Sequence, residues 1–190
     1  VTNSGGATFT GAVTTDTSVV LTDTTDAANI TFTGALTTPT LTTATQGYDL
    51  DLLGNGTSIT NAVTFANTGT LQLGDAAGDV LTFTGGVTAL APSGVTLNAE
   101  LRTAGTAVSL GDAGTPVTLA GTTSIIDTTN AGGVVAGAGI TVNGAVDGTV
   151  ADTQSLTLNA GTGGVIGFGS TVGTGTSLKT LTVTNSGGAT

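Results

Sequence analysis

The sequence predicts an all-β protein, a right-handed parallel β-helix (β-solenoid) of about eight coils of about 23 residues, with three faces per coil. Three observations lead to this prediction. The composition favours short strands and turns, an apolar-Thr-apolar pattern returns along the whole chain, and one octapeptide occurs twice.

The composition combines strand-forming residues with turn-forming residues. The chain has 190 residues, of which 46 are Thr and 32 are Gly, and 38% of its residues are hydrophobic while 7% are charged. Thr and Val are β-branched and favour the pleated backbone, whereas frequent Gly breaks helices and suits tight turns. Aromatic residues make up only 3%. A narrow interior of small aliphatic side chains therefore fits better than a sandwich built around large ones.

Strand-like segments with the pattern apolar-Thr-apolar follow one another from end to end. Measured from Val1, the spacings between them are 8, 23, 33, 18, 14, 22, 23, 16 and 25 residues, which predict coils of about 23 residues with faces of about 8. The spacing of 33 predicts an extra face or a loop at 39–61 that carries Tyr48. The segments are centred on Phe9, Phe32, Phe65, Phe83, Leu97, Leu119, Val142, Leu158 and Val183.

Alternate residues of each segment are expected to point into the core, and glycine-containing dipeptides are expected at the corners. The inward pairs are Val19 and Leu21, Leu71 and Leu73, Val108 and Leu110, Leu156 and Leu158, and Leu181 and Val183. The corners, where a positive φ is needed, are Gly5-Gly6, Asn55-Gly56, Gly85-Gly86, Gly132-Gly133 and Gly163-Gly164.

The octapeptide VTNSGGAT occupies residues 1–8 and again residues 183–190. Eight identical residues at an offset of 182 predict that 1–190 is a single solenoid segment, one 182-residue period of a tandem array plus an eight-residue overlap. Neither end shows a polar capping segment, so adjoining copies are expected to complete the sheet edges.

Two stretches carry a resemblance to a known class of protein. SLTLNAGTGGVIGFGSTVG at 155–173 and GITVNGAVDGTVADTQSLTLNAGTGG at 139–164 resemble the repeat regions of giant bacterial exoproteins, as does LKTLTVTNSGGAT at 178–190 continued by FTGAVTT at 9–15. The exoproteins that they resemble are the filamentous-haemagglutinin-like and autotransporter-type β-strand-repeat adhesins. The resemblance implies a right-handed β-helix, export from the cell and a role in adhesion, biofilm or filament structure.

Several function classes are disfavoured by the residues present. Arg102 and Lys179 are the only basic residues in a chain of net charge −10, so no surface suits nucleic acid. No apolar stretch is long enough for a transmembrane helix. The chain has no His and no Cys, which removes most nucleophile–base pairs and zinc sites. We expect no enzyme activity and assign no catalytic, cofactor-binding or metal-binding residue.

Three alternatives depend on surface side chains. The carboxylate pairs Asp49 with Asp51, Asp75 with Asp79, and Asp23 with Asp26 are the only acid–base candidates. Calcium is the ion that these residues could bind, because LGDAAGD at 73–79 and LGDAGT at 110–115 place Asp carboxylates in similar turns. Ice binding would need a ladder of Thr-x-Thr pairs such as Thr8/Thr10, Thr31/Thr33 and Thr82/Thr84, but no such pair occurs between Thr84 and Thr174.

The functional expectation is a structural repeat module of a secreted bacterial surface fibre, located outside the cell or on its surface. Its partners would be further copies of itself, joined head to tail or bundled side by side. The alternative is an adhesin stalk or binding module that recognises glycan or another cell surface, most readily through 39–61 and Tyr48.

Overall fold

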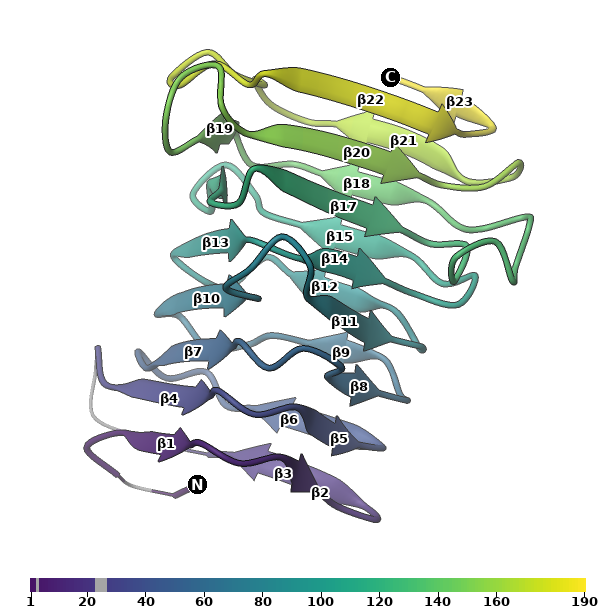
Figure 1. Ribbon diagram of the computed structural model, residues 1–190. Helices are drawn as coiled ribbons and strands as arrows, with labels where there is room; N and C mark the ends of the chain where they lie inside the picture. Colours follow the sequence, from purple (N-terminus) through teal and green to yellow (C-terminus); the bar gives the residue numbers. More distant parts are fainter. Residues whose placement is uncertain (3, 23–26) are drawn as a thin grey trace.

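The computed structural model describes residues 1–2, 4–22 and 27–190, and this part of the chain is a parallel β-solenoid without a helix (Figure 1). In Figure 1 the strands in front run from left to right and those behind run from right to left as the chain climbs from N to C, which makes the coil right-handed. The predicted fold class is confirmed.

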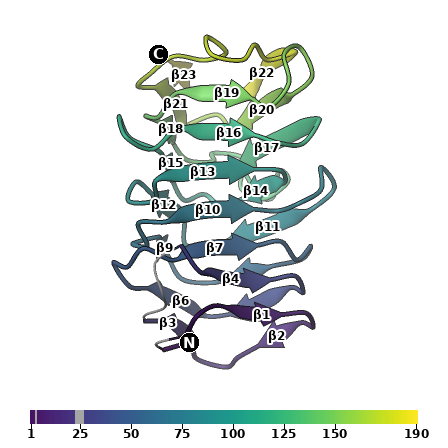
Figure 2. The same cartoon turned by 90° about the vertical axis from the view of Figure 1, so that its left-hand side faces the viewer.

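Three parallel sheets form the sides of the solenoid (Figures 1 and 2). Sheet I contains β1 (Ala7–Phe9), β4 (Asn29–Phe32), β7 (Asp49–Leu52), β10 (Thr70–Leu73), β13 (Gly94–Leu97), β16 (Val117–Leu119) and β19 (Val146–Gly148). Sheet II contains β2 (Val13–Thr14), β5 (Leu36–Thr38), β8 (Ser58–Ile59), β11 (Val80–Phe83), β14 (Glu100–Arg102), β17 (Thr123–Asp127), β20 (Ser155–Asn159) and β22 (Thr180–Asn185). Sheet III contains β9 (Val63–Thr64), β12 (Val87–Ala89), β15 (Val108–Leu110), β18 (Ile140–Val142), β21 (Val165–Phe168) and β23 (Gly188–Ala189).

The third side begins as a separate pair, β3 (Ser18–Leu21) and β6 (Thr40–Thr43), which lies behind sheets I and II near the N-terminal end of the stack (Figure 1). A side chain connects this pair to sheet III. The hydroxyl of Thr43 donates to the carbonyl of Thr64 at 3.3 Å and accepts a hydrogen bond from the backbone N–H of Ala66 at 2.7 Å. We call β3, β6 and sheet III together the rear face.

Each coil contributes one strand to each side, so β1 to β21 form seven complete coils and β22 and β23 begin an eighth. Coil length varies along the stack. The step from Phe32 to Leu52 is among the shortest between residues in register, and the step from Ile126 to Leu158 is among the longest. The average coil has roughly 24 residues, which lies within the usual range of repeat lengths in solenoid proteins.

The core consists of columns of apolar side chains that run parallel to the axis of the solenoid. In sheet I, Leu52, Leu73, Leu97 and Leu119 lie in register and none of them is exposed. Near the N-terminal end, the rings of Phe9 and Phe32 stack with centroids 4.6 Å apart. Such contacts between identical or similar side chains are spaced by the interstrand distance of about 4.8 Å, so each coil covers the one before it.

The predicted inward pairs lie on the predicted side of their strands. Leu71, Leu73, Val108, Leu110, Leu156, Leu158 and Leu21 are buried, and Val19 packs against the core. Leu181 and Val183 continue the columns of Leu156 and Leu158, although nothing covers them in this chain.

The segment 39–61 follows the regular coil, and the prediction of an extra face or a loop there is wrong. Tyr48 is fully buried, its hydroxyl donating to the carbonyl of Leu21 at 3.3 Å and accepting from the N–H of Ala44 at 3.2 Å. The coil from Phe32 to Leu52 is shorter than the average coil and has no room for an extra face. The spacing of 33 arose because Phe32 lies in sheet I and Phe65 follows β9 of sheet III, so the two residues never belonged to one column.

The predicted corners are right at four of five dipeptides. Gly6, Gly56, Gly86 and Gly132 have positive φ, but neither residue of Gly163-Gly164 does. At that corner Gly161 supplies the positive φ of 69°. Gly164 is required for a different reason, because a Cβ there would clash with the carbonyl oxygen of Ala138.

Truncating a column residue tests the stacking directly. Leu97→Ala removes a fully buried side chain between Leu73 and Leu119. We expect the free energy of unfolding to fall by about 2–5 kcal/mol, because the lost burial adds to the cavity that remains. Chemical denaturation measures the change. Thr96→Ala, on the outer side of the same strand, is the control and should change stability by less than about 0.5 kcal/mol.

Candidate functional surfaces

The carboxylates of Asp49 and Asp51 point outward from β7 on one side of sheet I and stabilise the backbone and neighbouring side chains. Asp49 accepts a hydrogen bond from the N–H of Thr70 at 2.6 Å. Asp51 accepts from the amide of Asn29 and the hydroxyl of Thr31, both at 2.9 Å. Each carboxylate therefore has a partner on an adjoining coil, which is the arrangement of a structural cross-strand contact.

Asp75 and Asp79 belong to one turn between β10 and β11. A carboxylate oxygen of Asp79 accepts from the N–H groups of Asp75 at 3.0 Å and Ala76 at 2.9 Å. Loss of solvent around its carboxyl group raises the pKa of Asp75, and the hydrogen bond and negative charge of Asp79 raise it further. The third pair, Asp23 and Asp26, lies outside the described residues.

Asp112 and Asp147 also accept hydrogen bonds from backbone N–H groups. Asp112, in the LGDAGT segment, accepts from the N–H of Gly114 at 2.7 Å. Asp147 accepts from the N–H groups of Gly175 and Thr176 at 2.9 and 3.0 Å. Asp112 thus makes the contact of a turn-forming aspartate, whereas Asp147, in β19, bonds to backbone groups of the next coil.

The largest departure from a regular coil is the loop that joins β17 to β18, which we call the 128–139 loop. Asp127 anchors it by accepting from the N–H of Thr129 at 2.8 Å, the hydroxyl of Thr129 at 2.6 Å and the N–H of Ala131 at 2.7 Å. Asn130 and Ala131 both have a φ of 54°, and Val135 is 65% exposed. The loop explains the long step from Ile126 to its partner on the next coil of sheet II.

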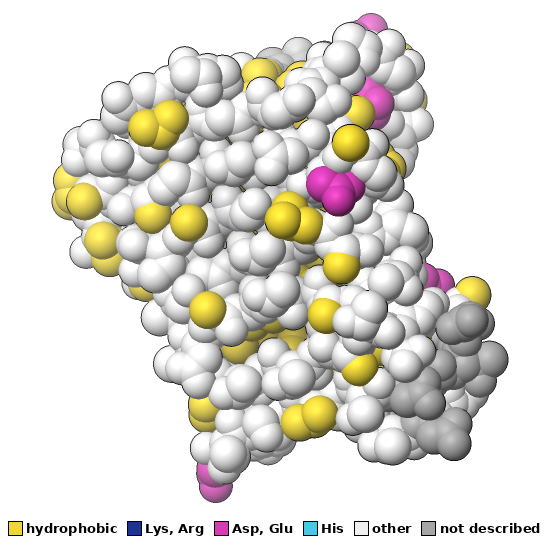
Figure 3. All heavy atoms as spheres, turned by 180° about the vertical axis from the view of Figure 1, so that it is seen from behind, with side chains coloured by type: hydrophobic (Ala, Val, Ile, Leu, Met, Phe, Trp, Pro, Cys, Tyr) yellow, Lys and Arg dark blue, Asp and Glu magenta, His cyan; other side chains and the backbone are white. Residues whose placement is uncertain are grey.

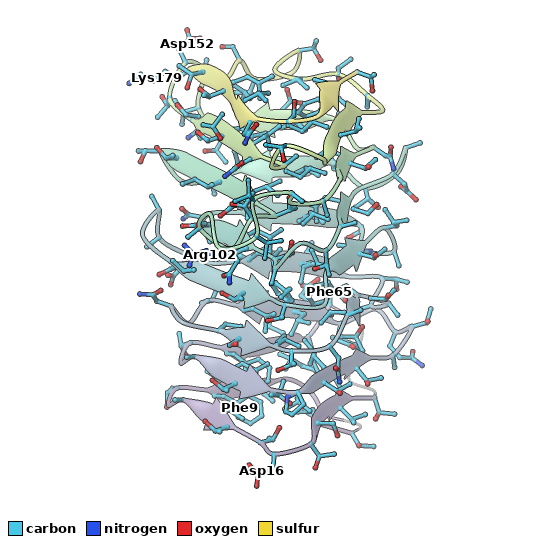
Figure 4. All side chains as sticks on the ribbon, turned by 90° about the vertical axis from the view of Figure 1, so that its right-hand side faces the viewer. Phe9, Asp16, Phe65, Arg102, Asp152 and Lys179 are labelled. Carbon is cyan, nitrogen blue, oxygen red and sulfur yellow. The ribbon has the colours of Figure 1, made fainter. Side chains whose placement is uncertain are left out.

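Charge is distributed unevenly over the three sides. Sheet I carries Asp49, Asp51 and Asp147, and sheet II carries Asp127 and the ion pair of Glu100 with Arg102 at 2.6 Å. The strands of the rear face, within the described residues, contain no Asp, Glu, Lys or Arg. Figure 3 shows this side as largely uncharged, whereas Arg102, Asp152 and Lys179 project outward in Figure 4.

The Thr-x-Thr pairs do not form one ladder. Thr8 and Thr31 are neighbours in sheet I, but the column continues with Asp51 and Gln72. Thr82 lies on sheet II, a different side of the molecule. A flat array of paired Thr residues for ice is therefore interrupted after two coils.

Apolar side chains of the columns are uncovered at the two ends of the stack. Leu181 and Val183 of β22 are 46% and 44% exposed, although they lie in register with the buried Leu156 and Leu158. Phe9 at one end and Phe168 at the other are only partly buried against the core. These end surfaces, together with the 128–139 loop, are the candidate functional surfaces.

The part of the chain that the structure describes shows no pocket, no group of three or more acidic side chains that could hold a metal ion, and no helix suited to crossing a membrane. No protein-family model, curated protein or solved structure matches this chain.

Removing the anchor of the 128–139 loop should loosen it. In Asp127→Ala, the N–H groups of Thr129 and Ala131 lose their acceptor in a buried position, so we expect a loss of about 1–3 kcal/mol of stability. Hydrogen exchange at these two amides should accelerate. The matched control is Asp16→Ala, because Asp16 is exposed and lacks the positive φ at which Ala would be strained, so its loss should leave both measurements unchanged.

The Asp75–Asp79 turn predicts a pH-dependent effect. Because the folded-state pKa of Asp75 is raised above its ordinary value of 3.8, its ionisation at neutral pH disfavours the folded state. Asp75→Asn should therefore raise the unfolding midpoint at pH 7, and the gain should disappear as the pH falls below 3.8. Asp79→Asn should lower the midpoint at pH 7, since it weakens the acceptor of two N–H groups. Equal effects of the two substitutions would contradict this assignment.

Proposed function

We propose that this chain is a structural repeat module of a secreted bacterial surface fibre, in which copies join end to end as one stiff β-solenoid rod. The observation that carries the proposal is that Leu181 and Val183 extend the buried columns yet remain about half exposed. A further coil would cover these side chains and pair the free edge of β22, as each coil does for the one before it.

The repeated octapeptide supports the same proposal, because residues 183–190 have the sequence with which the unit starts. Net charge of −10 and hydroxyl-rich strands would keep such rods soluble. The resemblance of 139–164 and 155–173 to repeat regions of bacterial exoproteins supports an extracellular or cell-surface location and export from a bacterium.

The second candidate is an adhesive binding module for glycan or another cell surface. The 128–139 loop favours it, because this loop interrupts the regular coil and presents Val135 to solvent. The segment 39–61 no longer supports it, since Tyr48 is buried. Glycan-array binding should then depend on the loop: replacing residues 130–136 by a short Gly-Ser turn would abolish binding, whereas a pure fibre module would bind no glycan in either form.

The fibre proposal predicts the shape of a longer chain. We consider a two-unit chain, residues 1–182 followed by residues 1–190. Eight coils at about 4.8 Å rise about 38 Å, so the two-unit chain should form a continuous rod about twice that length. Small-angle X-ray scattering and electron microscopy measure the length and the stiffness. Two compact particles joined by a flexible segment would contradict the proposal.

A further inference from the structure

The two copies of the octapeptide lie on different sides of the solenoid. Val1 pairs with the rear face, since its amino group donates to the carbonyl of Val20 at 2.8 Å and its carbonyl accepts from the N–H of Thr22 at 2.9 Å. Val1 therefore lies opposite Leu21 of β3. Its counterpart Val183 lies in sheet II, opposite Leu158.

The second half of the octapeptide also joins different sheets in its two copies, again displaced by one side of the solenoid. Ala7 begins β1 in sheet I and lies opposite Ile30, whereas its counterpart Ala189 lies in sheet III, opposite Ile166. Both alanines occupy inward positions, and both valines do as well. At these two positions the copies agree in facing the core and differ in the sheet that they join.

The number of coils in the unit explains this displacement. From Val13 to Val183 the chain makes seven coils within sheet II. From Val1 to Val13 it passes from the rear face through sheet I to sheet II, which is two of the three sides. The chain from Val1 to Val183 therefore makes seven and two-thirds turns.

β21, which pairs with β23, has the same types of inward residue as β4, which pairs with β1. In β4, Ile30 and Phe32 lie opposite Ala7 and Phe9. In β21, Ile166 lies opposite Ala189, and the N–H of Phe168 donates to the carbonyl of Thr190 at 3.0 Å. The residue after Thr190 would therefore lie opposite Phe168, and in a tandem array that residue is Phe9 of the next copy.

We propose, on the basis of the proposed end-to-end assembly, that sheet I of the next copy continues sheet III of this one, with Phe9 of the next copy stacked on Phe168. The partner that fits this end surface is a second copy of the chain, turned by one third of a turn. Phe168, Phe9 and Phe32 would then form one aromatic stack across the junction, since Phe9 already stacks on Phe32 at 4.6 Å.

An aligned junction, with sheet I continuing sheet I, fits the residues less well. It would place Phe9 of the next copy on the side of sheet I, where residues 171–176 already pair with β19 through a parallel bridge between Val146 and Val172 and a hydrogen bond from the N–H of Gly148 to the carbonyl of Thr176 at 3.2 Å. Residues 171–176 contain no aromatic side chain on which that ring could stack. It would also require residues 183–190 to leave their present sheets.

The proposal has a consequence for the whole fibre. Because each copy is rotated by one third of a turn relative to the one before it, the uncharged rear faces of successive copies would lie on different sides of the rod. The rear face would return to the same side after three copies. Three copies make 23 coils, so features such as the 128–139 loop should repeat along one side of the rod every ~110 Å, at about 4.8 Å per coil.

Because this chain contains no Trp, a single introduced Trp can report on the junction by its fluorescence. In the two-unit chain, Phe168→Trp in the first unit places one fluorophore at the junction, and the same substitution in the second unit places it at an open end. We expect bluer emission and weaker acrylamide quenching in the first unit. Phe9→Ala in the second unit should reverse both changes for the first-unit Trp, whereas Val19→Ala in the second unit, also partly buried near the N-terminal end, should reverse neither.

One outcome is that scattering shows a continuous rod while Phe9→Ala leaves the emission and acrylamide quenching of the first-unit Trp unchanged. That result would overturn the one-third turn and leave the fibre proposal standing. If the units are separate particles and the Trp is equally exposed in both, the fibre proposal fails and this inference fails with it. Incorporation of 4-fluorophenylalanine provides a second readout that needs no bulkier side chain. The resonance of Phe168 in the first unit should then shift on Phe9→Ala in the second.

Discussion

The structure depends on one constraint, which is that each inward side chain lies directly on a side chain of the preceding coil. The column of Leu52, Leu73, Leu97 and Leu119 shows it most simply, because all four are buried and in register. Stacking at the interstrand spacing fills the interior with aliphatic groups and leaves the polar chemistry to the surface. The carboxylates whose hydrogen bonds are described above accordingly serve turns and cross-strand contacts, as Asp49 and Asp79 do.

The repeated apolar-Thr-apolar pattern was sufficient to predict the fold but not the side to which each strand belongs. All three sheets use the same pattern, so sequence spacing cannot separate Phe83 in sheet II from Leu97 in sheet I. This ambiguity produced the wrong loop at 39–61. The buried position of Tyr48 could not be predicted either, because its hydroxyl is satisfied by backbone groups of Leu21 and Ala44 that only the coiled chain brings near.

The candidate surfaces were predicted in part. The repeated octapeptide indicated that copies meet at the ends, but its two different sheet positions depend on the exact number of coils, and coil length varies along the stack. The 128–139 loop was missed, although Asp127 followed by Asn130 and Gly132-Gly133 is a turn-forming run longer than any other corner needs. Its form depends on the buried Asp127 carboxylate, whose partners the sequence does not identify.

The register of the columns is tested most directly by backbone NOE contacts in the isotopically labelled protein. The account predicts contacts between strands that lie one full coil apart, for example between β13 and β16 with Val95 opposite Val117 and Leu97 opposite Leu119. It also predicts no antiparallel contacts between consecutive strands such as β10 and β11. A ladder of hairpin contacts between consecutive strands, with Leu97 and Leu119 far apart, would contradict the stacked solenoid.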